Sequence, residues 1–212
     1  FLDSRIEIKD FARMVNESYA GFDDPEIAPL RKLDQNLWLM ELFHGPTLAF
    51  KDYALQLVGR LFDYVLQARR QRITVIGATS GDTGSAAIEA CRDRQSIDIF
   101  ILHPKGRISE VQRRQMTTVA ATNVYNIAIE GTFDDCQGLV KGMFNDAIFR
   151  DELGLSSVNS INWARILAQT VYYFSAVLKL GVAKSNIAFA VPTGNFGNVY
   201  AGYVAKQMGL PF

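Results

Sequence analysis

Short apolar runs alternate with longer stretches of helical periodicity through the middle and the end of the chain. The apolar runs, which are rich in β-branched residues and typical of buried strands, lie at residues 73–77, 97–102, 124–129 and 187–191. The stretches with apolar residues at helical spacing lie at residues 84–94, from 109, from 132 towards 153, 163–180 and 198–208. Strands and helices that alternate at this spacing predict βαβ units and a mostly parallel sheet covered by helices.

The first 70 residues follow a different pattern. An acidic stretch that contains proline (21–29) precedes a short strand at 37–43, and a long amphipathic helix begins at about Phe50. We place a domain boundary near residue 72 and the return of the chain to the first domain between residues 165 and 185. The sequence therefore predicts an α/β protein with two domains.

Composition argues against several classes of protein. The 22 basic residues balance 22 acidic ones and 49% of the chain is apolar, which is typical of a folded globular protein. There is no basic excess for a nucleic acid, and no apolar run approaches the ~20 residues that a membrane helix needs. Two histidines and two cysteines without a CxxC motif do not predict a metal site. Cys91 and Cys136, with no signal peptide before them, indicate free thiols in the cytoplasm.

A glycine-rich segment follows the first strand of the alternation. Gly81 and Gly84 allow the backbone to approach an anion closely, and the helix that starts here adds unpaired N–H groups. Ser80 and Thr83 add hydroxyl donors. The segment suits a carboxylate or a phosphate, although a tight turn with Asp82 or Thr83 as helix cap explains the same residues. It matches neither the dinucleotide-binding GxGxxG pattern nor the Walker A motif.

A second glycine-rich segment, PTGNFGN at 192–198, again follows a predicted strand and precedes a predicted helix. The backbone N–H groups of such a loop can hold an oxyanion without a lysine or a metal. Thr193 and Asn198 can donate side-chain hydrogen bonds. A structural turn is the alternative, but two loops of anion-binding type in one chain support each other.

Lys51 lies near the first turn of the long predicted helix, and Leu48, Phe50 and Tyr53 leave little polar surface around its amine. Most lysines on amphipathic helices are solvated surface charges. Among apolar groups and near a helix N-terminus, however, the charged form is disfavoured, and a neutral amine can form a Schiff base with a carbonyl. A neutral lysine and two loops for anions together predict pyridoxal phosphate as the cofactor.

Five segments in series resemble threonine synthases. They are HGPTLAFKDYA (44–54), GATSGDTGSAAI (77–88), HPKGRISEVQRRQMTT (103–118), NSINWARILAQTVYYF (159–174) and PTGNFGNVYAG (192–202). This resemblance implies a fold-type II pyridoxal phosphate enzyme, with mostly parallel twisted sheets, helices on both faces, and the cofactor between two α/β domains. It places residues 1–72 and 169–212 in an incomplete large cofactor domain and 73–168 in a smaller α/β domain. We expect the chain to be truncated at both ends.

The resemblance also assigns roles to individual residues. Lys51 matches the lysine that forms the Schiff base, and Asp82 matches a residue that faces the phenolic oxygen of the cofactor. The loop that grips the cofactor phosphate comprises Gly194, Asn195, Phe196, Gly197 and Asn198. The residues that hold the substrate carboxylate are Ser80, Gly81 and Thr83. The residues that hold the substrate phosphate are Asn159, Ser160 and Arg165.

The activity that this resemblance implies is a carbon–oxygen lyase reaction on a phosphate ester. The family converts O-phospho-L-homoserine and water into L-threonine and phosphate, the last step of threonine biosynthesis. A monomer or a homodimer that binds a small substrate, and neither nucleic acid nor membrane, is expected. Two alternatives stay open: a related pyridoxal phosphate-dependent phospho-lyase or dehydratase, and a catalytically silent paralogue that retains the cofactor.

Overall fold

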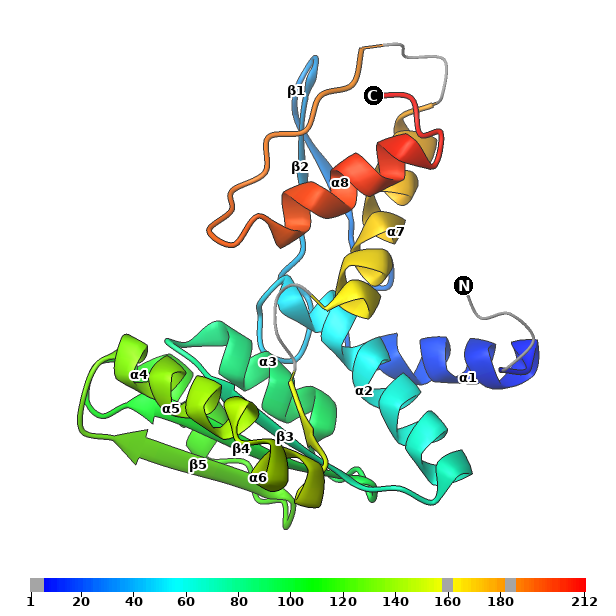
Figure 1. Ribbon diagram of the computed structural model, residues 1–212. Helices are drawn as coiled ribbons and strands as arrows, with labels where there is room; N and C mark the ends of the chain where they lie inside the picture. Colours follow the sequence, from blue (N-terminus) through cyan, green and yellow to red (C-terminus); the bar gives the residue numbers. More distant parts are fainter. Residues whose placement is uncertain (1–5, 158–161, 182–185) are drawn as a thin grey trace.

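A four-stranded parallel sheet forms the lower half of the molecule in the computed structural model, which describes residues 6–157, 162–181 and 186–212 (Figure 1). The strands follow the order β5-β4-β3-β6. Val75 pairs with Ile99, and Ile99 pairs in turn with Val124, so one line of residues crosses three strands. The strands are β3 (Ile73–Ala78), β4 (Ile97–Pro104), β5 (Val124–Ile129) and β6 (Leu155–Ser156).

Helices cover both faces of this sheet. Ile99 and Ile101 of β4 face a core shared with α2 (Lys51–Arg69), α3 (Asp82–Cys91) and α4 (Glu110–Thr117). The alternate residue Leu102 faces Cys136 of α5 (Phe133–Asn145), which is followed by the short α6 (Ala147–Glu152). The alternation of side chains along a strand thus supplies two apolar layers. The predicted α/β class, with a parallel sheet between helices, is confirmed.

The remaining elements lie above the sheet or, in the case of α1, to the right of α2 in Figure 1. They are α1 (Ile8–Tyr19), the antiparallel strands β1 (Leu30–Asp34) and β2 (Leu37–Met40), α7 (Trp163–Leu180) and α8 (Gly197–Gln207). Their core includes Tyr172 and Tyr173 of α7 and Ala201 of α8. Helix α2 contributes Tyr53 to this core and Leu55 to the core of the four-stranded sheet. The first turn of α2 therefore lies where the two halves meet. The domain division at residues 72 and 168 stays a prediction.

One predicted strand is absent. Residues 187–191 have no strand assignment, and they run alongside α7 and β2 without a partner strand among the residues that the structure describes. A β-strand needs backbone hydrogen bonds to a neighbour, so an apolar, β-branched run alone does not create one. The predicted helix from 132 towards 153 is also divided in two, because Asp146 caps a new helix by accepting a hydrogen bond from the N–H of Phe149 (3.0 Å).

The helix cap that the sequence predicts at Ser109 is present in the structure. Ser109 accepts a hydrogen bond from the N–H of Gln112 at the start of α4.

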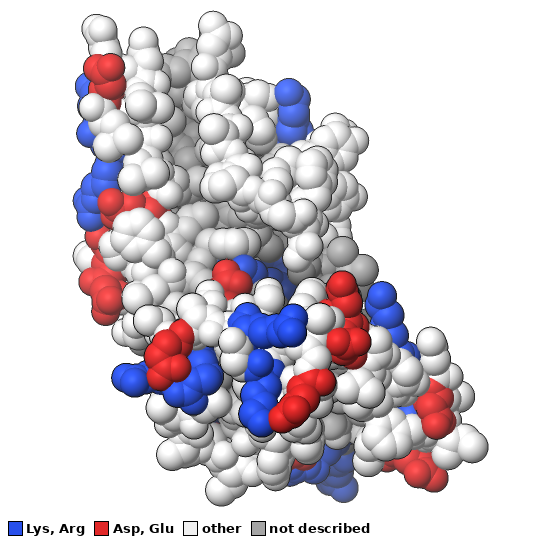
Figure 2. Space-filling model, turned by 90° about the vertical axis from the view of Figure 1, so that its left-hand side faces the viewer, with Lys and Arg blue, Asp and Glu red and all other residues white. Residues whose placement is uncertain are grey.

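Charged side chains gather on the lower part of the face in Figure 2, over the four-stranded sheet and its helices, and the upper part is mostly uncharged. Within the described ranges, none of the helices has the length and apolar character that crossing a membrane requires.

Candidate active site

Lys51 is the first residue of α2, and its side chain is only 12% exposed. Its Nζ lies 2.5 Å from Oδ2 of Asp82 and 4.6 Å from the centre of the Phe50 ring. The sequence predicted a neutral amine among apolar groups, and the structure differs by adding a carboxylate. The two side chains form an ion pair in which that of Asp82 is 47% exposed. The pair forms because the start of α3 lies against the start of α2, which residue spacing could not show.

The loop before Lys51 is held by a buried carboxylate. Asp52 is fully buried and accepts hydrogen bonds from the N–H of Thr47 (2.8 Å) and from the hydroxyl of Thr47 (2.7 Å). Burial raises the pKa of Asp52, and the charge of Asp82 raises it further, although the two hydrogen bonds from Thr47 oppose that shift. Gln115 of α4 donates a hydrogen bond to the carbonyl of Thr47 (3.1 Å). The position of Lys51 is thus fixed from both halves of the molecule.

The first glycine-rich loop is organised by Thr79. Its hydroxyl oxygen accepts hydrogen bonds from the N–H of Gly81 (3.1 Å) and of Gly84 (2.9 Å). A Cβ at Gly84 would lie 2.5 Å from Cγ2 of Thr79, so the close packing here requires glycine. Helix α3 begins at Asp82 with Gly81 as its N-cap residue, so the alternative of Asp82 or Thr83 as the cap is wrong. Gly81 has no side chain to cap α3, and the hydroxyl of Thr79 takes this part for the N–H of Gly84.

The second glycine-rich loop has its own internal bonds. The hydroxyl of Thr193 donates to Oδ1 of Asn198 (2.6 Å), and the N–H of Phe196 donates to that hydroxyl oxygen (3.0 Å). The side-chain amide of Asn198 donates to the carbonyl of Pro192 (2.9 Å), so this side chain shapes the loop. Phe196 has a left-handed backbone with φ of 60°, a costly conformation for a residue with a side chain. Helix α8 starts immediately after it, with Gly197 and Asn198 in its first turn.

Residues of both loops line one cavity of about 570 Å³. Ser80, Thr83 and Gly84 come from the first loop, and Asn195 comes from the second. Its lining also includes residues for which the sequence predicted no role: Phe133, Gln137, Val140 and Lys141 of α5, and Ser157 after β6. The α5 residues share one helical face, and that spacing is the signal that could have indicated them. Asp82, the ion-pair partner of Lys51, lies in the chain between the lining residues Ser80 and Thr83.

Arg165 lies in the first turn of α7 and is only 3% exposed, so the alternative of a surface ion pair is wrong. Burial lowers its pKa to about 10, and the charge of Asp82 opposes that shift. Asn159 and Ser160, the other residues predicted to hold the substrate phosphate, lie outside the described residues.

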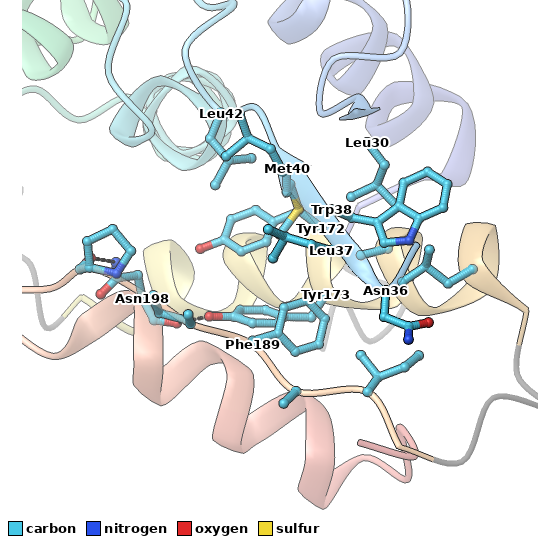
Figure 3. A pocket seen from close by; sticks show the side chains of 18 of the residues that line it. Leu30, Asn36, Leu37, Trp38, Met40, Leu42, Tyr172, Tyr173, Phe189 and Asn198 are labelled. Carbon is cyan, nitrogen blue, oxygen red and sulfur yellow. Dashed lines mark hydrogen bonds between the residues drawn. The ribbon is translucent and has the colours of Figure 1, made fainter. Parts of the chain in front are cut away.

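A larger apolar groove of about 900 Å³ lies on the other side of the second loop. Figure 3 shows Met40 and Trp38 of β2 on one side of it and Tyr173 and Phe189 on the other. The hydroxyl of Tyr173 donates to the carbonyl of Asn198 (2.7 Å), which links the groove to the start of α8. Its lining includes Pro192 and Asn198 of the second loop but no residue of the first, so the smaller cavity, which residues of both loops line, is the better candidate for chemistry.

The donor groups around this cavity fit pyridoxal phosphate. Lys51 supplies an amine that can bind an aldehyde, and its buried position protects that bond from water. Gly197 and Asn198 present first-turn N–H groups of α8, and a Cβ at Gly194 would meet nothing within 4 Å, so an anion can approach this backbone. The donor set thus provides an attachment point for the aldehyde and a cradle for the phosphate.

A family model described as pyridoxal-phosphate dependent enzyme matches residues 25–211. The chain belongs to this pyridoxal phosphate-dependent family. Membership agrees with the cofactor predicted from the sequence. The five segments that resemble threonine synthases are likewise confirmed as a resemblance by the individual relatives.

Two kinds of relative within the pyridoxal phosphate-dependent family are informative. The curated threonine synthase of Pseudomonas aeruginosa is 59% identical over 211 residues, which is 100% of this chain and 45% of that protein. A crystal structure of PLP-bound threonine synthase from Brucella melitensis has 60% identity and a TM-score of 0.92, covering 96% of this chain and 44% of that one. Yeast threonine synthase has 49% identity and a TM-score of 0.87, covering 94% and 42%. The chain spans about half the length of the curated relatives it matches.

Proposed function

We propose that this chain forms part of a threonine synthase, which converts O-phospho-L-homoserine and water into L-threonine and phosphate. The observation that carries the proposal is the sheltered amine of Lys51, which pairs with Asp82 in the first glycine-rich loop, while residues of both loops line one cavity. Identity of 59–60% to threonine synthases supports this choice of reaction. Pyridoxal phosphate bound here would supply a conjugated ring that stores negative charge from the reacting carbons.

Lys51 has two tasks in this proposal. Its Nζ would hold the aldehyde of a bound cofactor, and the same amine, when unattached, would take protons from the substrate carbons and return them. Oδ2 of Asp82 lies 2.5 Å away and accepts a hydrogen bond from this amine, which would orient it between these transfers. Asp52 and Thr47 keep the start of α2 in place. This arrangement positions one amine for several proton transfers on neighbouring carbons.

The two loops position the anionic groups. We assign the cofactor phosphate to the backbone of residues 194–198 at the start of α8, and the substrate carboxylate to Ser80, Gly81 and Thr83 at the start of α3. We keep Arg165, together with Asn159 and Ser160, as candidates for the substrate phosphate. The oligomeric state, monomer or homodimer, and the cytoplasmic location stay predictions.

Replacing Lys51 by alanine tests the proposal. K51A should lose both the visible absorbance of the lysine-bound cofactor and the formation of threonine, because no other group supplies the attachment and the proton transfers. K105A is a matched control, since Lys105 is an exposed lysine whose amine pairs with Glu130. It should leave the absorbance and the turnover unchanged. Retained absorbance in K51A would assign the attachment to another lysine.

The products separate the proposal from its alternatives. A phospho-lyase or dehydratase would form 2-oxobutanoate from O-phospho-L-homoserine and no threonine, whereas a silent paralogue would bind the cofactor and release no phosphate. Chromatography of the amino and keto acids, together with a phosphate assay on the same reaction, distinguishes the three.

A further inference from the structure

Helix α4 contacts both the loop before Lys51 and the first glycine-rich loop, and it does so with one face. Gln112, Gln115 and Met116 lie at positions i, i+3 and i+4, which are neighbours on a helix surface. The side-chain amide of Gln115 donates to the carbonyl of Thr47 (3.1 Å). One end of this face is therefore bonded to the segment that carries the amine.

The same face of α4 lies against the backbone of the first glycine-rich loop. A Cβ at Gly81 would lie 2.5 Å from Cδ of Gln112, and a Cβ at Gly84 would lie 2.7 Å from Sδ of Met116. The hydroxyl of Ser109 donates to Oε1 of Gln112 (3.0 Å), which fixes this side chain over the loop. The absence of side chains on the two glycines thus lets α4 approach the loop closely.

Other polar side chains of α4 bond within the helix instead. Arg113 and Arg114 both donate to the carboxylate of Glu110. The hydroxyl of Thr117 donates to the carbonyl of Arg113 (2.9 Å). The two glutamines are distinguished from these residues because their side chains contact segments outside α4.

Each glutamine is one step from the ion pair of Lys51 and Asp82. Gln115 bonds to Thr47, whose N–H and hydroxyl donate to the carboxylate of the residue after Lys51. Gln112 covers the residue that precedes Asp82. The two partners of the ion pair thus belong to segments that are both attached to α4.

We infer that Gln112 and Gln115 are positioning residues that jointly set the separation between Lys51 and Asp82. This inference rests on the proposed function, which gives the amine its task. Each glutamine fixes one segment to the same helix, so losing either contact frees one segment relative to the other. Losing both should cost little more than losing one, because residues that act through one arrangement are not additive. Misplacement of a reacting group lowers turnover.

The test compares the holoenzymes of Q115M, Q112A and the double variant with the wild type. Methionine keeps the size of Gln115 but cannot donate to Thr47, and alanine removes the cover over Gly81. Q112M restores that cover, and Q71M is the control, since Gln71 is an exposed glutamine after α2. Two quantities are measured: kcat/KM for O-phospho-L-homoserine, and the visible circular dichroism of the bound cofactor. The second depends on how the lysine-bound ring is oriented and needs no turnover.

Q115M and Q112A should each lower kcat/KM about 2- to 10-fold, the range that one hydrogen bond or contact accounts for. Both should weaken the visible dichroism, and the double variant should match the more affected single variant in both quantities. Q112M should recover most of the loss of Q112A, and Q71M should match the wild type. A role in folding alone would leave the dichroism of the folded holoenzyme unchanged.

The outcomes separate this inference from the proposed function. If the wild type forms threonine but the losses of the two single variants multiply in the double variant, or if the dichroism is unchanged, the inference is wrong and the proposed function stands. If the wild type forms no threonine yet the three variants weaken the dichroism equally, the proposed function fails and the positioning role of α4 is retained.

Discussion

The amine of Lys51 is held by residues that are distant in sequence and by one that is adjacent. Asp82 binds its Nζ, and Asp52, the next residue, fixes the preceding loop through two hydrogen bonds with Thr47. The two carboxylates have different tasks: Asp52 is fully buried and structural, whereas the side chain of Asp82 is 47% exposed and faces the amine. Burial raises the pKa of Asp52, so its charged form is retained at a cost.

Substitutions at Asp52 should separate its hydrogen bonds from its charge. D52A leaves the N–H and hydroxyl of Thr47 without their partner, so the free energy of unfolding should fall by about 1–3 kcal/mol. D52N can accept from the N–H and donate to the hydroxyl oxygen, so its loss should be smaller. Urea denaturation of both variants measures the difference. Equal losses would show that the charge, not the hydrogen bonds, is required.

The difference in stability between the wild type and D52N should depend on pH, and the direction follows from the raised pKa of Asp52. A carboxyl whose pKa is raised in the fold binds its proton at higher pH in the native state than in the unfolded chain. Lowering the pH from neutrality towards 3.8, the ordinary value for Asp, should therefore increase the stability of the wild type relative to D52N.

At the scale of elements, α2 is the central support of the site because it packs on both halves. It approaches α3 closely at Gly59, where a Cβ would lie 2.3 Å from the carbonyl oxygen of Ala90. Glycine lets the two backbones approach, and this approach also brings the start of α3, with Asp82, near Lys51. A small residue inside α2 therefore contributes to the geometry of the amine.

Two glycine-to-alanine substitutions in helices should have opposite effects. G59A should lower the free energy of unfolding by about 1–3 kcal/mol, because the added methyl group meets backbone that cannot move freely. G138A in α5 has open space around its Cβ and should be neutral or stabilising by up to about 1 kcal/mol, because alanine favours the helix. Thermal and chemical denaturation measure both. Stabilisation by G59A would contradict the close contact between α2 and α3.

At the scale of the whole molecule, the two halves differ in surface chemistry. The lower half carries most of the charged residues visible in Figure 2, and the upper half contains the apolar groove of about 900 Å³. Leu37 and Leu39 of β2 line this groove and are 57% and 45% exposed. These side chains leave apolar surface open to solvent in the groove.

The 212-residue chain should therefore bind an apolar dye. Anilinonaphthalene sulfonate should gain fluorescence on binding, and L39K should reduce that gain because it places a charge in the groove. V111K is the matched control, since Val111 of α4 is 68% exposed and does not line the groove. A fluorescence titration of the three proteins provides the measurement. An equal gain in L39K and the wild type would place the dye elsewhere.

The sequence by itself determined the elements with strong periodicity and the segments that carry chemistry. Residues 124–129 and 163–180 form the strand and the helix that their patterns predict, since local spacing of apolar residues decides which side is buried. Glycines between a strand and a helix indicated both loops, and the apolar neighbours of Lys51 indicated a sheltered amine.

Only the tertiary structure decided what lies opposite these residues. It paired Lys51 with a carboxylate 31 positions away, placed Lys141 in the cavity, and left residues 187–191 without a partner strand among the described residues. Each of these outcomes depends on contacts between segments that are far apart in the chain. Local periodicity fixes which face of an element is buried, but ion pairs, cavities and sheets form between elements, so their partners are set by packing.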